Sequence, residues 1–229
     1  MQKPLLLLGI DTCGPSGSVA LGLLAGQRVE ILGQIELAGR TYSTTLLAGI
    51  SALLARHGFD LKDLVAIVAV QGPGSFTGVR VCLSAAKGLA EAADLPIVAI
   101  SRLAVLASKG GTDAAALDAH RHEVFLRLGR QGSEAQEMLA GAAELAEIAR
   151  PAGTIAVCED GAATLLAEAW TDAELVRLEA PTAADALQFA ATRVEAGEFA
   201  DRALLDGHYL RRSDAEIFGD PAAKESRSA

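Results

Sequence analysis

The sequence contains no asparagine, and it has only three cysteines and four histidines among its 229 residues. Without asparagine the chain can carry neither an N-glycosylation acceptor nor a Cys–His–Asn catalytic triad. Cys13, Cys82 and Cys158 lie far apart and in no CxxC spacing, which favours free thiols in a reducing compartment. The histidines form no HExxH pattern, so no metal site is predicted.

The chain also lacks long apolar runs. None approaches the roughly 20 residues that a membrane-spanning helix needs, and the run at residues 4–9 is too short for a signal peptide. We therefore expect a cytoplasmic protein that makes no use of a membrane. Aromatic residues are only 4% of the chain against 51% hydrophobic residues in all, so the core must be built from Ala, Leu, Val and Ile.

The net negative charge falls on one half of the sequence. Residues 1–100 carry seven basic and seven acidic side chains, so the whole net charge of −9 falls on the remainder. An acidic second half binds a phosphate backbone poorly on its own. If a nucleic acid is involved, we expect another subunit to hold it.

Short glycine turns divide the first half into a recognisable order of elements. Residues 4–11, 18–25 and 28–37 read as three antiparallel strands. The pattern then predicts a helix over 41–57, a buried strand over 64–70, a helix over 77–93, a strand over 96–100 and a helix over 102–109. Ser101 is the expected N-cap of that last helix.

The second half partly repeats this order. Strands are predicted over 114–119 and 123–130, and residues 134–140 suit either a third strand or a helix start. Helices are expected over 141–150, 162–170 and 182–197, with a strand over 154–160. Two copies of a β-β-β-α-β-α unit indicate two similar α/β lobes, residues 1–109 and 110–210, followed by a mobile tail over 211–229.

The run "GPGSFTG" at residues 72–78 joins a predicted strand to a predicted helix. Its glycine spacing is not that of a dinucleotide site, no P-loop lysine follows it, and Ser75 lacks the flanking glycines of a nucleophile elbow. A sharp strand-to-helix turn, in which Ser75 or Thr77 caps the helix, explains the composition. A cradle for a ligand and a close fit to another protein remain the alternatives.

The hairpin "GIDTCGPSGSVAL" at residues 9–21 offers a second candidate site. A carboxylate at the end of a strand, followed by small polar residues, can face a metal–phosphate group, and Asp11, Thr12 and Ser18 are placed to do so. The alternative is that Asp11 only caps the turn. The corresponding turn of the second lobe, residues 118–123, has no glycine to let a backbone approach a phosphate.

The helix predicted over 41–57 has no charged residue between Arg40 and Arg56, and its other face is small and polar. The helix predicted over 77–93 is similarly uncharged at its centre. Helices of this kind are usually covered on more than one side, so we expect an interface unless the second lobe covers them.

Four stretches carry a resemblance to a known family. They are "LGIDTCGPSGSVAL", "QGPGSFTGVRVCLSAAKGLA", "LPIVAISRLAVLA" and "YLR" at 209–211, with a weaker match at "LDAHRHEVFL". The chain is identified by them as similar to the TsaB (YeaZ) family. This resemblance implies the two-lobed actin-like, sugar-kinase-like fold.

The resemblance also implies a function without catalysis. Members of the family support a catalytic paralogue of the same fold (TsaD-like) that places a threonylcarbamoyl group on the adenosine beside the tRNA anticodon, together with an ATPase subunit (TsaE-like). The paralogue's metal-binding histidine pair has no counterpart in "RTYSTTLLAGI". The expectation is a subunit that needs no cofactor, with ATP or ADP bound only in the complex and tRNA held only through it.

The same resemblance assigns the two uncharged helices to a dimer face with the paralogue or, in isolation, with a second copy. The implied interface residues are Tyr42, Leu46, Leu47, Ile50, Leu53, Leu54, Gly74, Ser75, Phe76, Thr77, Arg80, Val81 and Ser84. The alternative functions are an ATP-dependent phosphotransferase and a metallopeptidase of the same superfamily.

Overall fold

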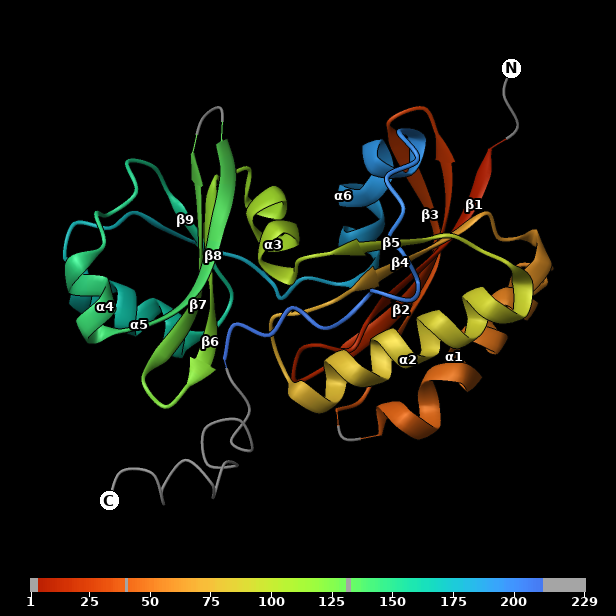
Figure 1. The fold of residues 1–229 in the computed structure, drawn as a ribbon, viewed down its shortest axis with the longest axis horizontal. Helices are drawn as coiled ribbons and strands as arrows, with labels where there is room; N and C mark the ends of the chain where they lie inside the picture. Colours follow the sequence, from red (N-terminus) through yellow and green to blue (C-terminus); the bar gives the residue numbers. More distant parts are fainter. Residues whose placement is uncertain (1–3, 40, 131–132, 212–229) are drawn as a thin grey trace, which may run out of the picture.

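Two five-stranded mixed sheets form the frame of the molecule (Figure 1). The computed structural model describes residues 4–39, 41–130 and 133–211. The first sheet has the order β3-β2-β1-β4-β5, with β1, β4 and β5 parallel and β1, β2 and β3 antiparallel. Its strands are β1 (Leu5–Asp11), β2 (Gly17–Ala25), β3 (Arg28–Leu37), β4 (Ala66–Val70) and β5 (Ile97–Ile100).

The second sheet repeats this arrangement. Its order β10-β9-β6-β7-β8 places an antiparallel meander beside two parallel strands, as in the first sheet. The strands are β6 (Ala114–His120), β7 (Glu123–Arg130), β8 (Ser133–Gly141), β9 (Ile155–Val157) and β10 (Leu175–Arg177). The predicted internal repeat is therefore confirmed, as is the two-lobed actin-like α/β fold.

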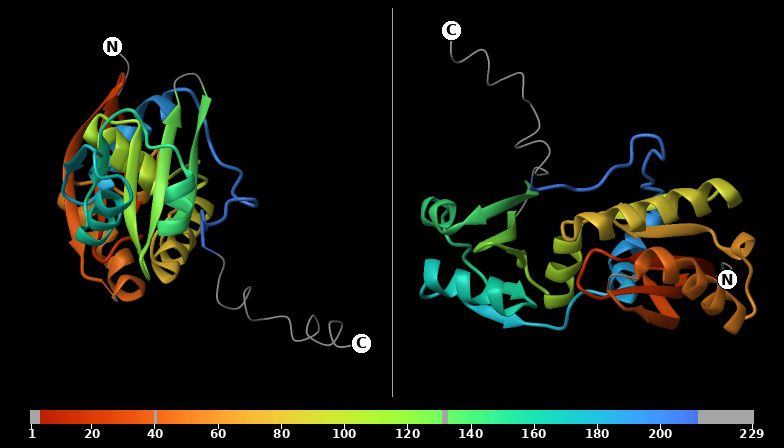
Figure 2. Two further views of the ribbon diagram at one scale, coloured as in Figure 1. Left: turned by 90° about the vertical axis from the view of Figure 1, so that its left-hand side faces the viewer. Right: turned by 90° about the horizontal axis from the view of Figure 1, so that it is seen from below.

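Helices cover both faces of each sheet (Figures 1 and 2). On the first sheet, α1 (Tyr42–Arg56) and α2 (Phe76–Ala93) lie on one face, and α6 (Ala183–Glu195) covers the other. On the second sheet, α4 (Ala142–Glu147) and α5 (Asp160–Ala169) face outward, while α3 (Arg102–Gly110) packs on the inner face. A 3-10 turn, η1 (Leu61–Asp63), precedes β4.

The last helix of each lobe packs on the sheet of the other lobe. Helix α3 follows the first sheet in sequence but contacts β6, β7 and β9, and α6 follows the second sheet but contacts β1 to β5. The five consecutive residues 103–107 of α3 are all buried. A helix that is apolar all round must be covered on several sides, and the space between the two sheets supplies that cover.

This exchange departs from lobes drawn simply along the sequence. The lobe predicted over 110–210 includes α6, whose buried side chains belong to the core of the first sheet. After α6, residues 198–211, here called the closing segment, run back toward the second sheet. The backbone N–H groups of Ala200 and His208 donate to the carbonyls of Ile97 and Gln71, at 2.8 and 2.7 Å. Beyond Arg211, the predicted tail lies outside the described residues.

Most predicted elements appear close to their expected bounds, and a few need correction. Residues 134–140 belong to a strand, β8, so the helix-start alternative is wrong. The helix predicted over 141–150 ends at Glu147. Neither β10 nor η1, which have three residues each, was predicted from the sequence. Over the described residues, none of the helices is both long and apolar enough to span a membrane.

Candidate functional site

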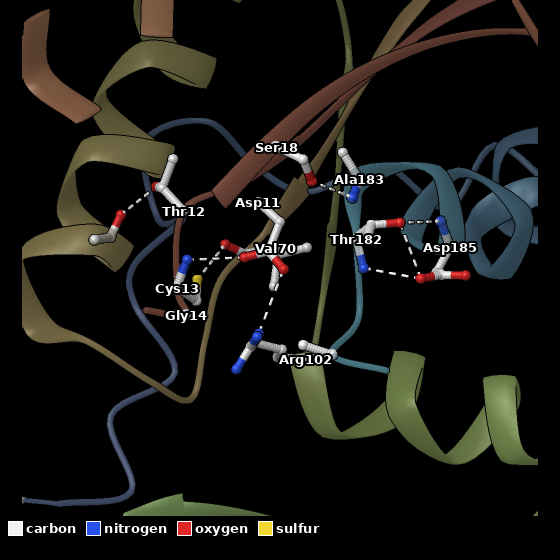
Figure 3. Close-up of polar contacts among 12 residues, drawn as sticks. Asp11, Thr12, Cys13, Gly14, Ser18, Val70, Arg102, Thr182, Ala183 and Asp185 are labelled. Carbon is white, nitrogen blue, oxygen red and sulfur yellow. Dashed lines mark hydrogen bonds and ion pairs between the residues drawn. The ribbon is translucent and has the colours of Figure 1, made fainter. Parts of the chain in front are cut away.

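Asp11, at the end of β1, is bound by an arginine inside the protein (Figure 3). Its Oδ2 lies 3.4 Å from Nε of Arg102, the first residue of α3, and its Oδ1 accepts a hydrogen bond of 2.8 Å from the backbone N–H of Cys13. Only 2% of the Asp11 side chain and 3% of the Arg102 side chain are exposed. The carboxylate predicted to face a metal–phosphate group thus faces a buried guanidinium.

The charge state of this pair follows from its surroundings. Burial alone lowers the pKa of Arg102, but the interactions with neighbouring acidic groups, chiefly Asp11, together outweigh this effect and the pKa is raised. Arg102 therefore stays charged. Burial, and next the charge of Asp11, raise the pKa of the Cys13 thiol well above its usual range, so Cys13 is a neutral neighbour.

The other two residues of the predicted phosphate loop are engaged by protein partners as well (Figure 3). Thr12 Oγ1 donates a hydrogen bond of 2.6 Å to the carbonyl of Gly78, and Ser18 Oγ accepts one of 2.8 Å from the backbone N–H of Ala183. Both hydroxyl-bearing residues are buried. Asp11, Thr12 and Ser18 lie close together, as the hairpin predicted, but each of them binds a group of the protein itself.

Glycines of the 72–78 loop let its backbone lie against the β1–β2 turn. A Cβ on Gly74 would come within 2.2 Å of the Cys13 carbonyl oxygen, and one on Gly78 within 1.9 Å of the Thr12 carbonyl oxygen. The N–H of Ser75 donates to the Cys13 carbonyl at 2.8 Å. The side chain of Ser75 caps α2, accepting from the Gly78 N–H at 3.2 Å. Between the two predicted caps, the structure thus selects Ser75 over Thr77.

The apolar stripe predicted as an interface on α1 packs mainly on the chain's own sheet. Its buried members are Tyr42, Leu46, Ile50, Leu53 and Leu54. Leu47 differs, with 56% of its surface exposed. An amphipathic helix covers its own sheet first, so only the outer edge of the stripe is left for a partner.

On α2 and the loop before it, more of the predicted interface residues reach the surface. Phe76 is 40% exposed, which is high for a large apolar side chain. The remaining exposed ones are Ser75, Thr77, Arg80 and Ser84, whereas Gly74 and Val81 are half-buried. Together with Leu47, these residues define what is here called the outer face of α1 and α2.

A second polar cluster, between the lobes, was not anticipated. Glu137 on β8 has only 7% of its side chain exposed. It accepts hydrogen bonds from Ser101 Oγ at 2.7 and 2.8 Å and from Arg127 Nη1 at 2.6 Å, and it lies 2.8 Å from Nε2 of His208. Burial raises the pKa of Glu137, but the hydrogen bonds from His208, Ser101 and Arg127 outweigh it and the pKa is lowered.

This cluster joins the end of the first sheet, two strands of the second sheet and the closing segment. Its members come from sequence positions 101, 127, 137 and 208, so no local motif could reveal it. The one indication in the sequence was Ser101 as an N-cap, and that prediction is confirmed by its hydrogen bond from the Ala104 N–H.

Two further histidines lie where β6 joins β7. His120 ends β6, and its side chain is 82% exposed and 3.5 Å from Asp118, while His122 lies in the turn that follows. Within residues 4–39, 41–130 and 133–211, no three His, Cys, Asp or Glu side chains are grouped so that they could hold a metal.

Comparisons with known proteins match this chain both to a transferase family and to TsaB proteins. A family model described as TsaD, tRNA N6-adenosine threonylcarbamoyltransferase, matches residues 32–191. The tRNA threonylcarbamoyladenosine biosynthesis protein TsaB of Haemophilus influenzae is 41% identical over 130 residues, which are 54% of this chain and 53% of that protein. TsaB of Escherichia coli is 35% identical over 125 residues, 52% of each chain. The chain spans about half the length of these curated relatives.

A solved structure extends the likeness over most of the chain. YeaZ from Pseudomonas aeruginosa has a TM-score of 0.70 and 27% identity, and the comparison covers 90% of this chain and 100% of that one. The similarity therefore includes both sheets and is not limited to the glycine-rich loop.

Proposed function

The chain belongs to the TsaB (YeaZ) family, and we propose that it is the non-catalytic partner subunit of a tRNA N6-adenosine threonylcarbamoyltransferase. Its task is to bind and support a transferase of the same fold that modifies the adenosine next to the anticodon. It carries out no turnover of its own. Alone it forms a homodimer that exchanges for the heterodimer when the transferase is present.

The observation that carries this proposal is the buried pair of Asp11 and Arg102. A carboxylate at the end of the first strand is suited to a metal–phosphate group only if it has a free lone pair and room beside it. Here the guanidinium lies at that carboxylate, 3.4 Å away, and is itself almost wholly buried. Arg102 is fixed there by α3, which is packed between the sheets, and its charge takes the place that a bound cation would have.

The outer face of α1 and α2 is the surface that suits a partner. It combines two exposed large apolar side chains, Leu47 and Phe76, with small polar residues that permit close helix packing and with one charged residue, Arg80. The buried side chains of α1 beneath this face pack in the core of the first sheet. A preformed face of this kind lowers the ordering cost of association.

The family resemblance implies the other members of the complex, and the charge of the chain bears on which of them holds the tRNA. With a net charge of −9, the chain is a poor surface for tRNA phosphates, so the transferase holds the tRNA. An ATPase subunit completes the complex in the cytoplasm. ATP or ADP is bound at the level of that complex, and this subunit needs no cofactor.

Light scattering after size exclusion tests the proposal, with the chain alone and mixed with the transferase of the same genome. We expect a one-to-one complex that replaces the homodimer. Leu47→Glu places a charge in the outer face and should abolish the complex. Phe199→Glu is the matched control, because Phe199 is 45% exposed just after α6, which covers the opposite face of the first sheet from α1. If the wild-type protein does not bind the transferase, the proposed function is refuted. If Leu47→Glu does not weaken binding, the outer face of α1 and α2 is not the binding surface.

A further inference from the structure

A hollow of about 330 Å³ lies between α2 and the closing segment. Its size is at the lower end of the range for ligand-binding clefts. It is lined from α2 by Phe76, Arg80, Leu83, Ser84 and Lys87, and from the closing segment by Leu205, Asp206 and Tyr209. A second, more open hollow adjoins it and shares Lys87.

Two cations in this hollow have no counter-ion among the residues that the structure describes. Most basic side chains that the structure describes form ion pairs, for example Lys109 with Asp185 and Arg150 with Asp172, but neither Arg80 nor Lys87 does. The chain as a whole has a large excess of carboxylates. Two neighbouring cations left unpaired in so acidic a chain are therefore available to an anionic group from outside.

The aromatic residues of the hollow hold Arg80 in a usable orientation. Its guanidinium carbon lies 3.6 Å from the centre of the Phe76 ring, and that ring lies 5.1 Å from the ring of Tyr209. When a guanidinium stacks on a ring, the flat face of the guanidinium contacts the ring and the N–H donors along its edge stay free. Those donors can bind a carboxylate through two parallel hydrogen bonds.

The spacing of the two cations suits a second helix. Arg80 and Lys87 are two turns apart on one face of α2, which corresponds to about 10 Å along the helix axis. Ser84, which is exposed, lies between them and leaves room for close approach. Two acidic residues two turns apart on a partner helix would meet both cations.

The rest of the lining favours a protein segment over a nucleic acid. Asp206 is part of the hollow, and Glu91 and Asp201 line the adjoining one. A phosphodiester chain carries a charge at every step and would have to pass these carboxylates, whereas a helix can present its charges only opposite Arg80 and Lys87. Exposed Phe, Tyr and Arg beside apolar side chains are instead typical of protein–protein contacts.

We propose that this hollow receives carboxylate side chains from a helix of the partner subunit that lies along α2, and that Arg80 and Lys87 select this partner by charge over a second copy of the chain. The inference rests on the proposed function, since it assumes a partner subunit. In a two-fold homodimer the same patch occurs on both sides of the interface, so a self-pair whose two-fold axis passes close to Arg80 and Lys87 brings cations toward cations. An acidic partner removes that repulsion.

The test measures the dissociation constant for the transferase of the same genome by titration calorimetry. Arg80→Glu and Lys87→Glu should each weaken binding by roughly tenfold or more at about 0.05 M NaCl, and by much less at about 0.5 M NaCl, because salt screens the charges. Arg28→Glu is the matched control. Arg28 is also exposed and unpaired but lies at the start of β3, so its reversal should change affinity by less than about twofold.

A neutralised variant adds a readout that misfolding cannot imitate. The double change Arg80→Gln and Lys87→Gln should weaken binding to the transferase and at the same time strengthen self-association, measured by sedimentation equilibrium. Thermal melting by circular dichroism checks that all variants fold.

The outcomes separate the two proposals. If wild-type protein does not bind the transferase, the proposed function fails and this inference fails with it. If wild-type protein binds but the reversed variants bind equally well, only the charge-selected site is overturned. If the reversals leave the transferase affinity unchanged but weaken binding of a tRNA anticodon stem-loop, the occupant is RNA and the inference is again overturned.

Discussion

Replacing Arg102 by methionine tests the central feature of the candidate site. Methionine keeps much of the length of the side chain but removes the charge, so the Asp11 carboxylate is left buried with one remaining hydrogen bond, from the Cys13 N–H at 2.8 Å. Removing one partner of a buried ion pair costs about 3–5 kcal/mol, because the other charge stays desolvated and uncompensated. For a chain of this size, that corresponds to a fall in melting temperature of roughly 6 to 20 °C.

A double-mutant cycle separates the pair from the packing around it. Asp11→Asn alone leaves the Arg102 guanidinium buried without its counter-ion and should also cost about 3–5 kcal/mol. In the double variant Asp11→Asn with Arg102→Met, no buried charge is left over, and the amide oxygen can still accept from the Cys13 N–H. We therefore expect the double variant to lose much less than the sum, with a coupling energy of at least about 2 kcal/mol.

Urea unfolding followed by circular dichroism measures all four proteins of the cycle. The pair joins β1 of the first sheet to α3, which packs on the second sheet, so its loss should also lower the cooperativity of unfolding. A cost of less than about 1 kcal/mol for Arg102→Met would place the pair among solvent-exposed ion pairs and refute the argument from burial. Additive single effects would show that the two groups do not interact directly.

Three further predictions concern glycine packing, acid stability and thiol reactivity. Gly78→Ala should lower the unfolding free energy measured in urea by about 3 kcal/mol or more, because the added Cβ would overlap the Thr12 carbonyl. Gly88→Ala, on the same helix but with open space around it, should raise the unfolding free energy by about 0.5–1 kcal/mol. Equal effects of the two substitutions would contradict the close packing at Gly78. The pKa of Glu137 is lower in the folded protein than its ordinary value of 4.5. The ionised carboxylate therefore stabilises the fold above pH 4.5, and this stability is lost as the pH falls through the pKa of the folded state. Glu137→Gln should flatten the decline of the unfolding free energy between about pH 5 and pH 3. Burial raises the pKa of the Cys158 thiol to about 12, so little reactive thiolate is present at neutral pH. A disulfide-exchange reagent should therefore label Cys158 slowly in the native protein and rapidly in denaturant. Fast labelling of the native protein would contradict the burial of this thiol.

The elements of the fold could be predicted from the sequence because their patterns are local. Short glycine turns between apolar runs define the two meanders, and Ser75 and Ser101 mark the starts of α2 and α3. The exchange of α3 and α6 between the sheets could not be predicted. Apolar residues all round α3 indicate cover on several sides, but they do not say which sheet supplies it.

The candidate site was predictable only in part, because its partners are distant in sequence. The hairpin at residues 9–21 identified Asp11, Thr12 and Ser18 as neighbours, since they share one turn. Their partners are contributed by other elements, and Arg102 lies 91 positions from Asp11. A buried arginine and a metal-bound phosphate both satisfy a carboxylate, so the local sequence around Asp11 is compatible with either.

The role of the glycine-rich loop follows from what lies on each side of it. Gly74 and Gly78 let it lie against the β1–β2 turn, and Gly72, with φ at +106°, brings it to the closing segment, where a Cβ would come 3.1 Å from the His208 carbonyl. Phe76, at the end of this loop, begins α2 and orients Arg80. Substitutions at these glycines should therefore weaken partner binding by shifting α2, even though none of the three need touch the partner. The loop thus fixes the position of α2, and with it the outer face, relative to the core. It needs glycine because its backbone closely approaches other parts of the chain, just as the backbone of a phosphate loop closely approaches its ligand.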